Sequence, residues 1–119
     1  MSNESLSSIN VLLDEFSAQA LENAAALSFR TLRKEASLRV IDHINRFEQP
    51  CCTTVGRMCR EVKIYVPLAL KTKISPFLYR EQYRIKTYSD ECSRRLKDHL
   101  LRYPTISAVG VVQERKHAS

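Results

Sequence analysis

Residues 5–50 form the stretch SLSSINVLLDEFSAQALENAAALSFRTLRKEASLRVIDHINRFEQP, which contains no glycine and no proline before Pro50. Ser5 or Ser7 can cap the start of a helix, and acidic residues follow them. Pro50 ends the stretch, because the residue before a proline is pushed out of the helical region. We therefore expect residues 4–48 to be helical, either as one long helix or as two.

The apolar residues of this stretch recur at a helical spacing, and the phase of this spacing changes after Leu27. Up to Leu27, the apolar residues recur at steps of three and four: Leu6, Ile9, Leu13, Phe16, Ala20 and Leu27. The polar Asn23 occupies the matching position between Ala20 and Leu27. This heptad-like spacing is typical of a helix that packs on another helix. Two helices would meet near Ser28–Thr31, but no turn residue marks a junction, so the pattern slightly favours one long helix.

The rest of the chain predicts a strand, a helix and a second strand. Apolar and other residues alternate over 62–70, which indicates a strand with one buried face. Ser75 followed by Pro76 is typical of a helix start, and helical spacing then continues to about Arg102. A second alternation predicts a strand near residues 105–113. We find no internal repeat.

These elements predict an α+β fold that is dominated by helix. A long N-terminal helix or helical pair (residues 1–49) would precede a small strand–helix–strand unit (residues 50–119), all within one domain of 119 residues. The chain has only two glycines, which disfavours all-β folds and excludes a glycine-rich phosphate-binding loop.

Targeting signals are not visible in the sequence. No apolar run approaches the about 20 residues of a membrane span, and the N-terminus lacks the pattern of a secretory signal. Four cysteines are too few for a disulfide scaffold in a chain of this length. We therefore expect an intracellular protein, in the cytoplasm or nucleus, without membrane contact.

Charge is distributed unevenly along the chain. Residues 1–29 contain four acids and no Lys or Arg, a formal charge of −4, whereas residues 30–119 contain nineteen Lys or Arg and nine acids, a formal charge of +10. The two values add up to the net +6 of the whole chain. This split suggests two surfaces, one acidic and apolar, the other suited to a polyanion.

Five basic residues are candidates for polyanion contact: Arg80, Arg84, Arg95 and Arg102, close to one stripe of the predicted 76–103 helix, and Lys73 before it. Tyrosines are interleaved with them, and arginine with aromatic side chains is the chemistry of nucleic-acid contact. A plain solvated face is the alternative, because Glu81, Glu91 and Asp98 neutralise part of the stripe.

Catalytic and metal sites are not supported by the spacing of the reactive residues. Cys51, Cys52, Cys59, Cys92 and His99 are poorly spaced for tetrahedral zinc, although the sequence leaves the question open. No cysteine has the local context of a nucleophile, and the acids are typical of helix surfaces. We therefore expect neither an enzyme nor a cofactor.

Two functional hypotheses remain. The first is a non-enzymatic interaction subunit of an assembly, associating with a protein partner or with its own copies through Leu6, Ile9, Leu13, Phe16, Ala20 and Leu27, with its basic half docked on an acidic partner. The alternative is a small nucleic-acid-binding regulatory protein. The sequence alone favours the first.

Overall fold

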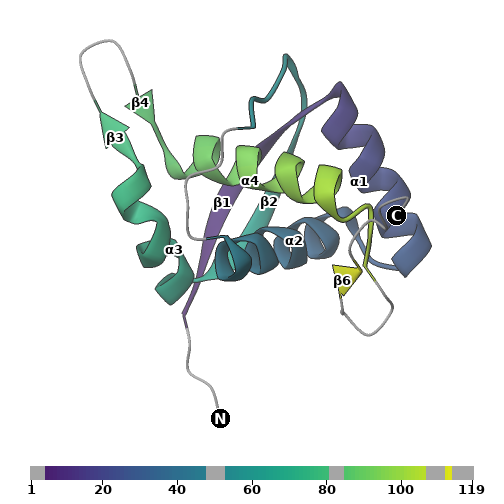
Figure 1. Ribbon diagram of the computed structural model, residues 1–119, viewed down its shortest axis with the longest axis horizontal. Coiled ribbons are helices and arrows are strands. Elements are labelled where there is room, and N and C mark those ends of the chain that lie inside the picture. Colours follow the sequence, from purple (N-terminus) through teal and green to yellow (C-terminus); the bar gives the residue numbers. More distant parts are fainter. Residues whose placement is uncertain (1–4, 48–52, 81–84, 107–111, 114–119) are drawn as a thin grey trace, which may run out of the picture.

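The chain begins with a strand, so the predicted order of elements is wrong. A computed structural model describes residues 5–47, 53–80, 85–106 and 112–113. Strand β1 (Leu6–Asp14) is followed by helices α1 (Glu15–Ser28) and α2 (Leu32–Arg46). Helices and strands are mixed, but no long N-terminal helix precedes a strand–helix–strand unit (Figure 1).

Strand β2 (Met58–Pro67) pairs with β1 in an antiparallel ribbon of two strands. Asn10 lies opposite Lys63, and the register holds from Leu6 opposite Pro67 to Leu13 opposite Arg60 before it shifts at Asp14. The predicted strand over 62–70 therefore exists, but it starts earlier and stops at Pro67.

Strand β1 forms because its apolar residues alternate. Ile9, Val11 and Leu13 are buried, whereas Ser8 and Asn10, which alternate with them, are exposed and Leu12 is partly buried. This period of two belongs to a strand with one covered face. Leu6, Ile9 and Leu13 satisfy a helical spacing as well, which is why the heptad-like interpretation of this segment was wrong.

The favoured single long helix is wrong, because two helices meet near Ser28–Thr31 after a strand that neither alternative included. Asp14 caps α1 by accepting a hydrogen bond from the Ser17 amide, and Thr31 caps α2 by accepting one from the Lys34 amide. Phe29 ends α1 in the left-handed conformation with φ 59°. Glycine usually occupies such a position, so its absence hid the turn.

The C-terminal half contains more elements than the sequence indicates. Helix α3 (Leu68–Ile74) and a 3-10 turn (Ser75–Phe77, with Pro76 in its first positions) follow β2. Then come β3 (Tyr79–Arg80), β4 (Ile85–Lys86), α4 (Tyr88–Arg102), β5 (Thr105–Ile106) and β6 (Val112–Gln113). The predicted 76–103 helix is thus interrupted by β3 and β4, and α4 begins with a capping box at Thr87.

The two halves of the chain have the same architecture, contrary to our expectation of no internal repeat. Each contains a ribbon strand, a helix and a longer second helix, in the orders β1–α1–α2 and β2–α3–α4. Glu35, Arg39 and His43 of α2 recur at identical spacing as Glu91, Arg95 and His99 of α4. The halves are therefore related by an approximate two-fold axis that passes between Asn10 and Lys63.

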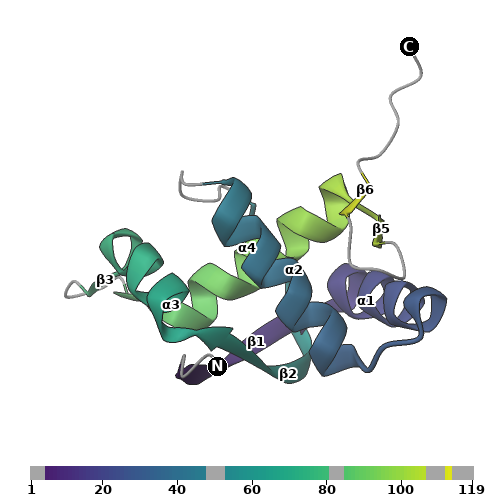
Figure 2. The ribbon, with the colours of Figure 1, turned by 90° about the horizontal axis from the view of Figure 1, so that it is seen from below.

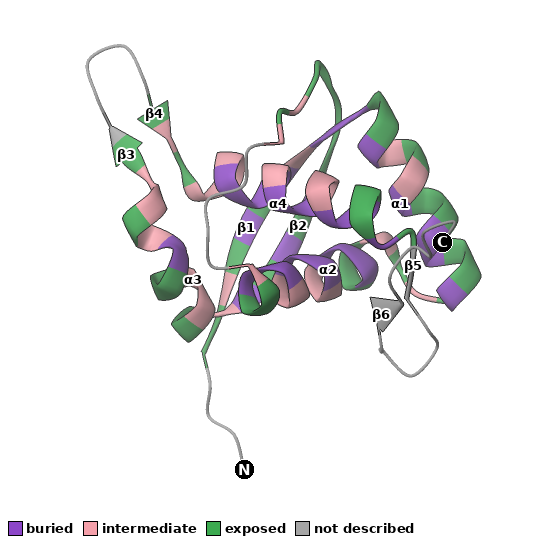
Figure 3. Ribbon diagram, viewed as in Figure 1, coloured by how far each residue is buried: buried purple, intermediate pink, exposed green. Residues whose placement is uncertain are grey.

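The core follows this two-fold relation. Each half contributes seven residues to the buried cluster: Ile9, Val11, Leu13, Leu21, Ala36, Val40 and Ile44 from the first, and Val62, Ile64, Val66, Ile74, Cys92, Leu96 and Leu100 from the second. Position by position, the second set repeats the first. Neither half has a core of its own, because α2 and α4 pack on each other and on the shared ribbon (Figure 3).

No helix among the described residues is long and apolar enough to span a membrane.

Candidate nucleic-acid interface

One face of the β1–β2 ribbon carries exposed side chains and no helix. Figure 2 shows the ribbon along one edge of the molecule, with α2 and α4 on its other side. The residues that point away from the helices are Ser8, Asn10 and Leu12 of β1 and Glu61, Lys63 and Tyr65 of β2, of which only Leu12 is partly buried. A two-stranded ribbon of this kind has the width of the DNA major groove.

The helices hold this ribbon at two equivalent points. The Leu12 amide donates a hydrogen bond to Ser93 Oγ of α4 at 2.7 Å, and the Tyr65 amide donates one to Ser37 Oγ of α2 at 3.1 Å. Leu12 corresponds to Tyr65 under the two-fold relation, and Ser93 to Ser37. The exposed face is therefore anchored to both helices.

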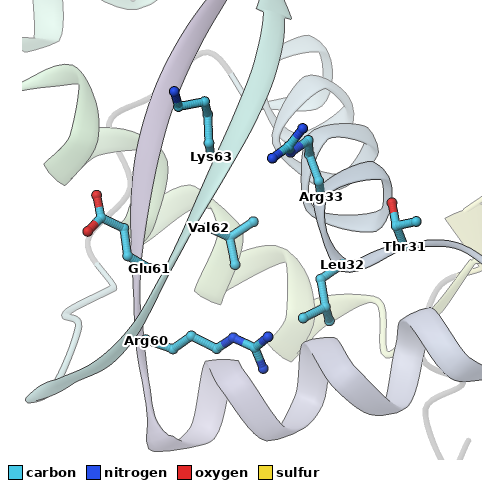
Figure 4. Close-up of a pocket in the computed structure, with 7 residues that line it drawn as sticks. All are labelled: Thr31, Leu32, Arg33, Arg60, Glu61, Val62 and Lys63. Carbon is cyan, nitrogen blue, oxygen red and sulfur yellow. The ribbon is translucent and has the colours of Figure 1, made fainter.

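A groove lies between β2 and the N-terminus of α2 (Figure 4). Its lining residues are Thr31, Leu32, Arg33, Arg60, Glu61, Val62 and Lys63. Arg33 is exposed, and its guanidinium lies 5.5 Å from the centre of the Tyr65 ring. Lys34 is also exposed in the first turn of α2, where the helix dipole already favours an anion. The groove therefore combines a helix N-terminus with several cations.

The second half lacks an equivalent cluster of cations at its helix start. Ser89 and Asp90 of α4 take the positions of Arg33 and Lys34, and Asp90 closes the capping box with Thr87. The Ser89 hydroxyl instead donates to the Asn10 carbonyl of the ribbon. The two halves of the exposed face therefore have the same backbone arrangement but carry different charges.

Buried charged residues join α2 to α4 beneath the ribbon. Arg39 pairs with Glu35 at 2.9 Å and Arg95 with Glu91 at 2.7 Å, and all four side chains are inaccessible to solvent. His99 of α4 contacts α2 with both ring nitrogens. Its Nε2 lies 2.9 Å from Asp42 Oδ2, and its Nδ1 lies 3.2 Å from Arg39 Nη1. Removing one partner of a buried ion pair generally costs about 3–5 kcal/mol, so these groups fix how the helices pack.

The partners of both histidines define their protonation. Arg95 lies 3.0 Å from Nδ1 of His43, and an arginine can only donate, so this nitrogen is an acceptor. The other nitrogen, Nε2, donates to Asp98 at 2.8 Å. His99 has the same arrangement with Arg39 and Asp42. Burial lowers the pKa of His43 and lowers that of His99 to about 4, so both rings are neutral near pH 7.

Asp14 connects the end of the ribbon to the rest of the fold. Its carboxylate accepts hydrogen bonds from Lys97 Nζ at 2.7 Å, the Gly56 amide at 2.8 Å and the Ser17 amide at 2.8 Å. Burial alone would raise the pKa of Asp14, but these donors outweigh it and hold the pKa well below its usual range. Asp14 therefore remains charged and keeps the β1–α1 corner in place.

Of the predicted polyanion residues, the three with described side chains lie at different places in the fold. Arg95 is fully buried, which excludes it from contact with a polyanion, and Arg102 is half-exposed beside Asp98 at the far end of α4. Lys73 is exposed on α3. The side chain of Arg80 and the whole of Arg84 lie outside the described residues.

The predicted association residues divide between two elements. Leu6, Ile9 and Leu13 belong to β1, and Ile9 and Leu13 fill the core of their own chain, which excludes them from a helical interface. On α1, Phe16 and Leu27 are exposed, and Ala20 is partly buried against the core. The accessible members are therefore Leu6 on β1 and Phe16 and Leu27 on α1, which do not share one helix.

Reactive side chains form no metal-binding cluster in the described part of the chain. No three His, Cys, Asp or Glu residues there are placed to hold a metal ion. Cys59 is exposed, and burial raises the pKa of Cys92 to about 12, so its thiol stays protonated. Cys51 and Cys52 lie outside the described residues.

Sequence patterns did not identify Ser8, Asn10 and Leu12 of the ribbon or the cations of α2 as candidate functional residues. Period-two alternation around Ile9 and Val11 was the available signal for Ser8 and Asn10. The repeated Glu, Arg and His of the two long helices was the available signal for a duplicated unit.

Part of the chain matches the model of a known protein family. The model of the TraY domain matches residues 9–53, which include most of β1, all of α1 and α2, and the segment after them. The match therefore covers the first strand–helix–helix unit. Neither the curated proteins nor the solved structures contain a match to the chain. The first unit of this chain is thus similar to a TraY domain.

Proposed function

We propose that this protein is a small DNA-binding regulatory protein that inserts its β1–β2 ribbon into the major groove. The TraY domain belongs to DNA-binding proteins of the conjugative relaxosome, which favours this role over our first hypothesis of an interaction subunit. It also favours a non-catalytic role. The observation that carries the proposal is the uncovered ribbon face, with alternating polar side chains on both strands.

The central pair of the ribbon is suited to base contacts. Asn10 and Lys63 lie opposite each other on the exposed face. An asparagine amide matches adenine in the major groove, and a lysine matches the acceptors of guanine. Glu61, two residues from Lys63, offers an acceptor for the amino group of cytosine. The proposed contacts therefore distinguish base pairs, each by about 1–3 kcal/mol.

The groove beside α2 is suited to the DNA backbone. Arg33 and Lys34 stand at the helix N-terminus, where amide groups and the helix dipole favour a phosphate. Phosphate contacts position a protein on the duplex without specifying sequence. In this proposal the ribbon selects the site and α2 fixes its orientation.

The salt dependence of DNA binding distinguishes phosphate contacts by α2 from base contacts by the ribbon. The affinity for duplex DNA should be measured by fluorescence anisotropy over a range of salt concentrations. Each lost phosphate contact makes the log–log slope less negative by about 0.9, so Arg33→Ala and Lys34→Ala should each change it by about that amount. Arg46→Ala is the matched control, because Arg46 is a half-exposed cation at the opposite end of α2. A slope equal in all four proteins would remove α2 from the proposed interface.

A further inference from the structure

Arg60 lines the groove beside the N-terminus of α2, but it is paired with an acid of another helix. Figure 4 shows its side chain extending from β2 toward Leu32. The Nη1 atom of Arg60 lies 2.7 Å from Oε2 of Glu22 on α1, to which it donates a hydrogen bond. This ion pair therefore connects the groove to α1.

Both partners of this ion pair are accessible to solvent. The Arg60 side chain is 44% exposed, and the Glu22 side chain is 47% exposed. Ion pairs between exposed side chains contribute little to stability, because water and salt weaken the attraction and because holding two long side chains together costs entropy. Another acceptor can therefore take the guanidinium of Arg60 without disturbing the fold.

The second half of the chain shows that the shared architecture does not require this pair. Under the two-fold relation, Arg60 of β2 corresponds to Ser7 of β1, and Glu22 of α1 corresponds to Ser75 after α3. Neither serine carries a charge. The ion pair thus occurs in the half that has cations at the start of its long helix, and its equivalent positions in the other half are uncharged.

Glu22 belongs to the acidic part of the chain and brings its charge to a largely cationic groove. Residues 1–29 contain no Lys or Arg and carry a formal charge of −4. The charged residues that line the groove are Arg33, Arg60, Lys63 and Glu61. A carboxylate on a guanidinium occupies donors that a phosphate uses, and it repels a phosphate nearby. Glu22 and a DNA phosphate in this groove are therefore rivals for one cation.

We propose that Arg60 is a further phosphate contact of the DNA interface and that Glu22 competes with the phosphate for it. This inference rests on the proposed function, which places the DNA backbone in the groove beside α2. In the free protein, Glu22 holds the Arg60 guanidinium at the groove. When DNA binds, a phosphate replaces the carboxylate and accepts two parallel hydrogen bonds from the guanidinium. Helix α1 therefore lowers the affinity for DNA through one acid.

Fluorescence anisotropy of the full chain with a labelled duplex of mixed sequence tests this competition, since phosphate contacts do not depend on sequence. At low salt, Glu22→Gln should bind about 3–10-fold more tightly than the parent, because it releases Arg60 and removes a charge that repels the phosphate. Glu15→Gln is the matched control: it removes the same charge from an exposed position of α1, about 10 Å from Glu22 along the helix axis. It should change the affinity by less than about 2-fold, because salt screens exposed charges over such distances.

Replacement of Arg60 shows whether Glu22 acts through this cation. Arg60→Ala should weaken binding and make the log–log salt slope less negative by about 0.9, because one phosphate contact is lost. When Arg60 is alanine, adding Glu22→Gln should raise the affinity no more than Glu15→Gln does. The urea midpoints of all these variants should match that of the parent, since an exposed ion pair contributes little to stability.

The outcomes separate this inference from the proposed function. The competition is overturned if Glu22→Gln binds DNA no more tightly than the parent, or if it gains as much affinity when Arg60 is alanine. If the parent binds DNA and Arg33→Ala changes its salt slope, such a result removes only the role of Glu22. A parent protein that binds no duplex DNA overturns the proposed function and this inference together.

Discussion

Single residues decide the boundaries of this fold in ways that ordinary sequence signals do not reveal. Phe29 ends α1 in a backbone conformation that normally calls for glycine, and Asp14 ends β1 while capping the next helix. The cap predicted at Ser75 is wrong, because Ser75–Phe77 is only a 3-10 turn without a side-chain cap hydrogen bond, and the cap of α4 at Thr87 was not predicted. Sequence patterns also miss a left-handed helix end that is occupied by a residue other than glycine, as at Phe29.

Replacing Phe29 by glycine should stabilise the protein. Glycine adopts φ 59° without the steric cost that Phe29 bears, although it loses more chain entropy on folding. We expect the free energy of unfolding to rise by about 0.5–1 kcal/mol, measured by urea denaturation. Phe29→Ala is the control, because alanine shortens the side chain but keeps the backbone strain. A loss of stability in Phe29→Gly would show that the exposed ring contributes to the fold.

At the scale of elements, helices α2 and α4 are joined by matched charged residues. The spacing of Glu35 with Arg39, and of Glu91 with Arg95, predicts the observed ion pairs. It does not predict their complete burial, because spacing within one helix carries no information about the helix packed against it. The sequence therefore predicts the partners but misses their role between the two helices.

The neutral histidines between these helices make stability depend on pH. The pKa of His99 is about 4 in the folded protein, and that of His43 is also lowered, against about 6.5 in the unfolded chain. Above pH 6.5 both states are neutral and the histidines add no pH dependence. As the pH falls from 6.5 toward 4, the unfolded state binds protons that the folded state does not bind. Stability therefore falls, by about 1.4 kcal/mol for each unit of pKa depression.

Urea denaturation at intervals between pH 7.5 and pH 4.5 measures this dependence. The midpoint should be constant above pH 6.5 and decline below it. Asp98 also has a lowered pKa, but its contribution is lost only near and below the usual carboxylate range, so it does not account for a decline that begins at pH 6.5. A midpoint that stays constant down to pH 4.5 would contradict the assigned histidine protonation.

At the scale of the whole molecule, one chain forms a two-fold arrangement from two unlike halves. The buried positions match in pairs, whereas the exposed ones have diverged, as with Asn10 and Lys63 or Lys34 and Asp90. Sequence comparison within the chain could have found the repeated Glu, Arg and His of the long helices. It could not have found the ribbon, because the pairing of β1 with β2 joins segments far apart in the sequence.

The divergence of the exposed positions has a consequence for DNA recognition. A symmetric ribbon would present the same side chains to both halves of its site and favour a palindrome. Here the two-fold relation matches side chains with different donors and acceptors: Ser8 with Glu61, Asn10 with Lys63 and Leu12 with Tyr65. We therefore expect a site whose two halves differ in sequence.

Selection of bound duplexes from a random pool tests the proposed ribbon contacts most directly. The parent protein should enrich a non-palindromic site, and Asn10→Ala and Lys63→Ala should each relax the preference at a different base pair near its centre. Lys34→Ala should weaken binding but leave the enriched sequence unchanged. Enrichment of the same sequence by the parent, Asn10→Ala and Lys63→Ala would contradict DNA recognition by the ribbon, as would the absence of any enrichment by the parent.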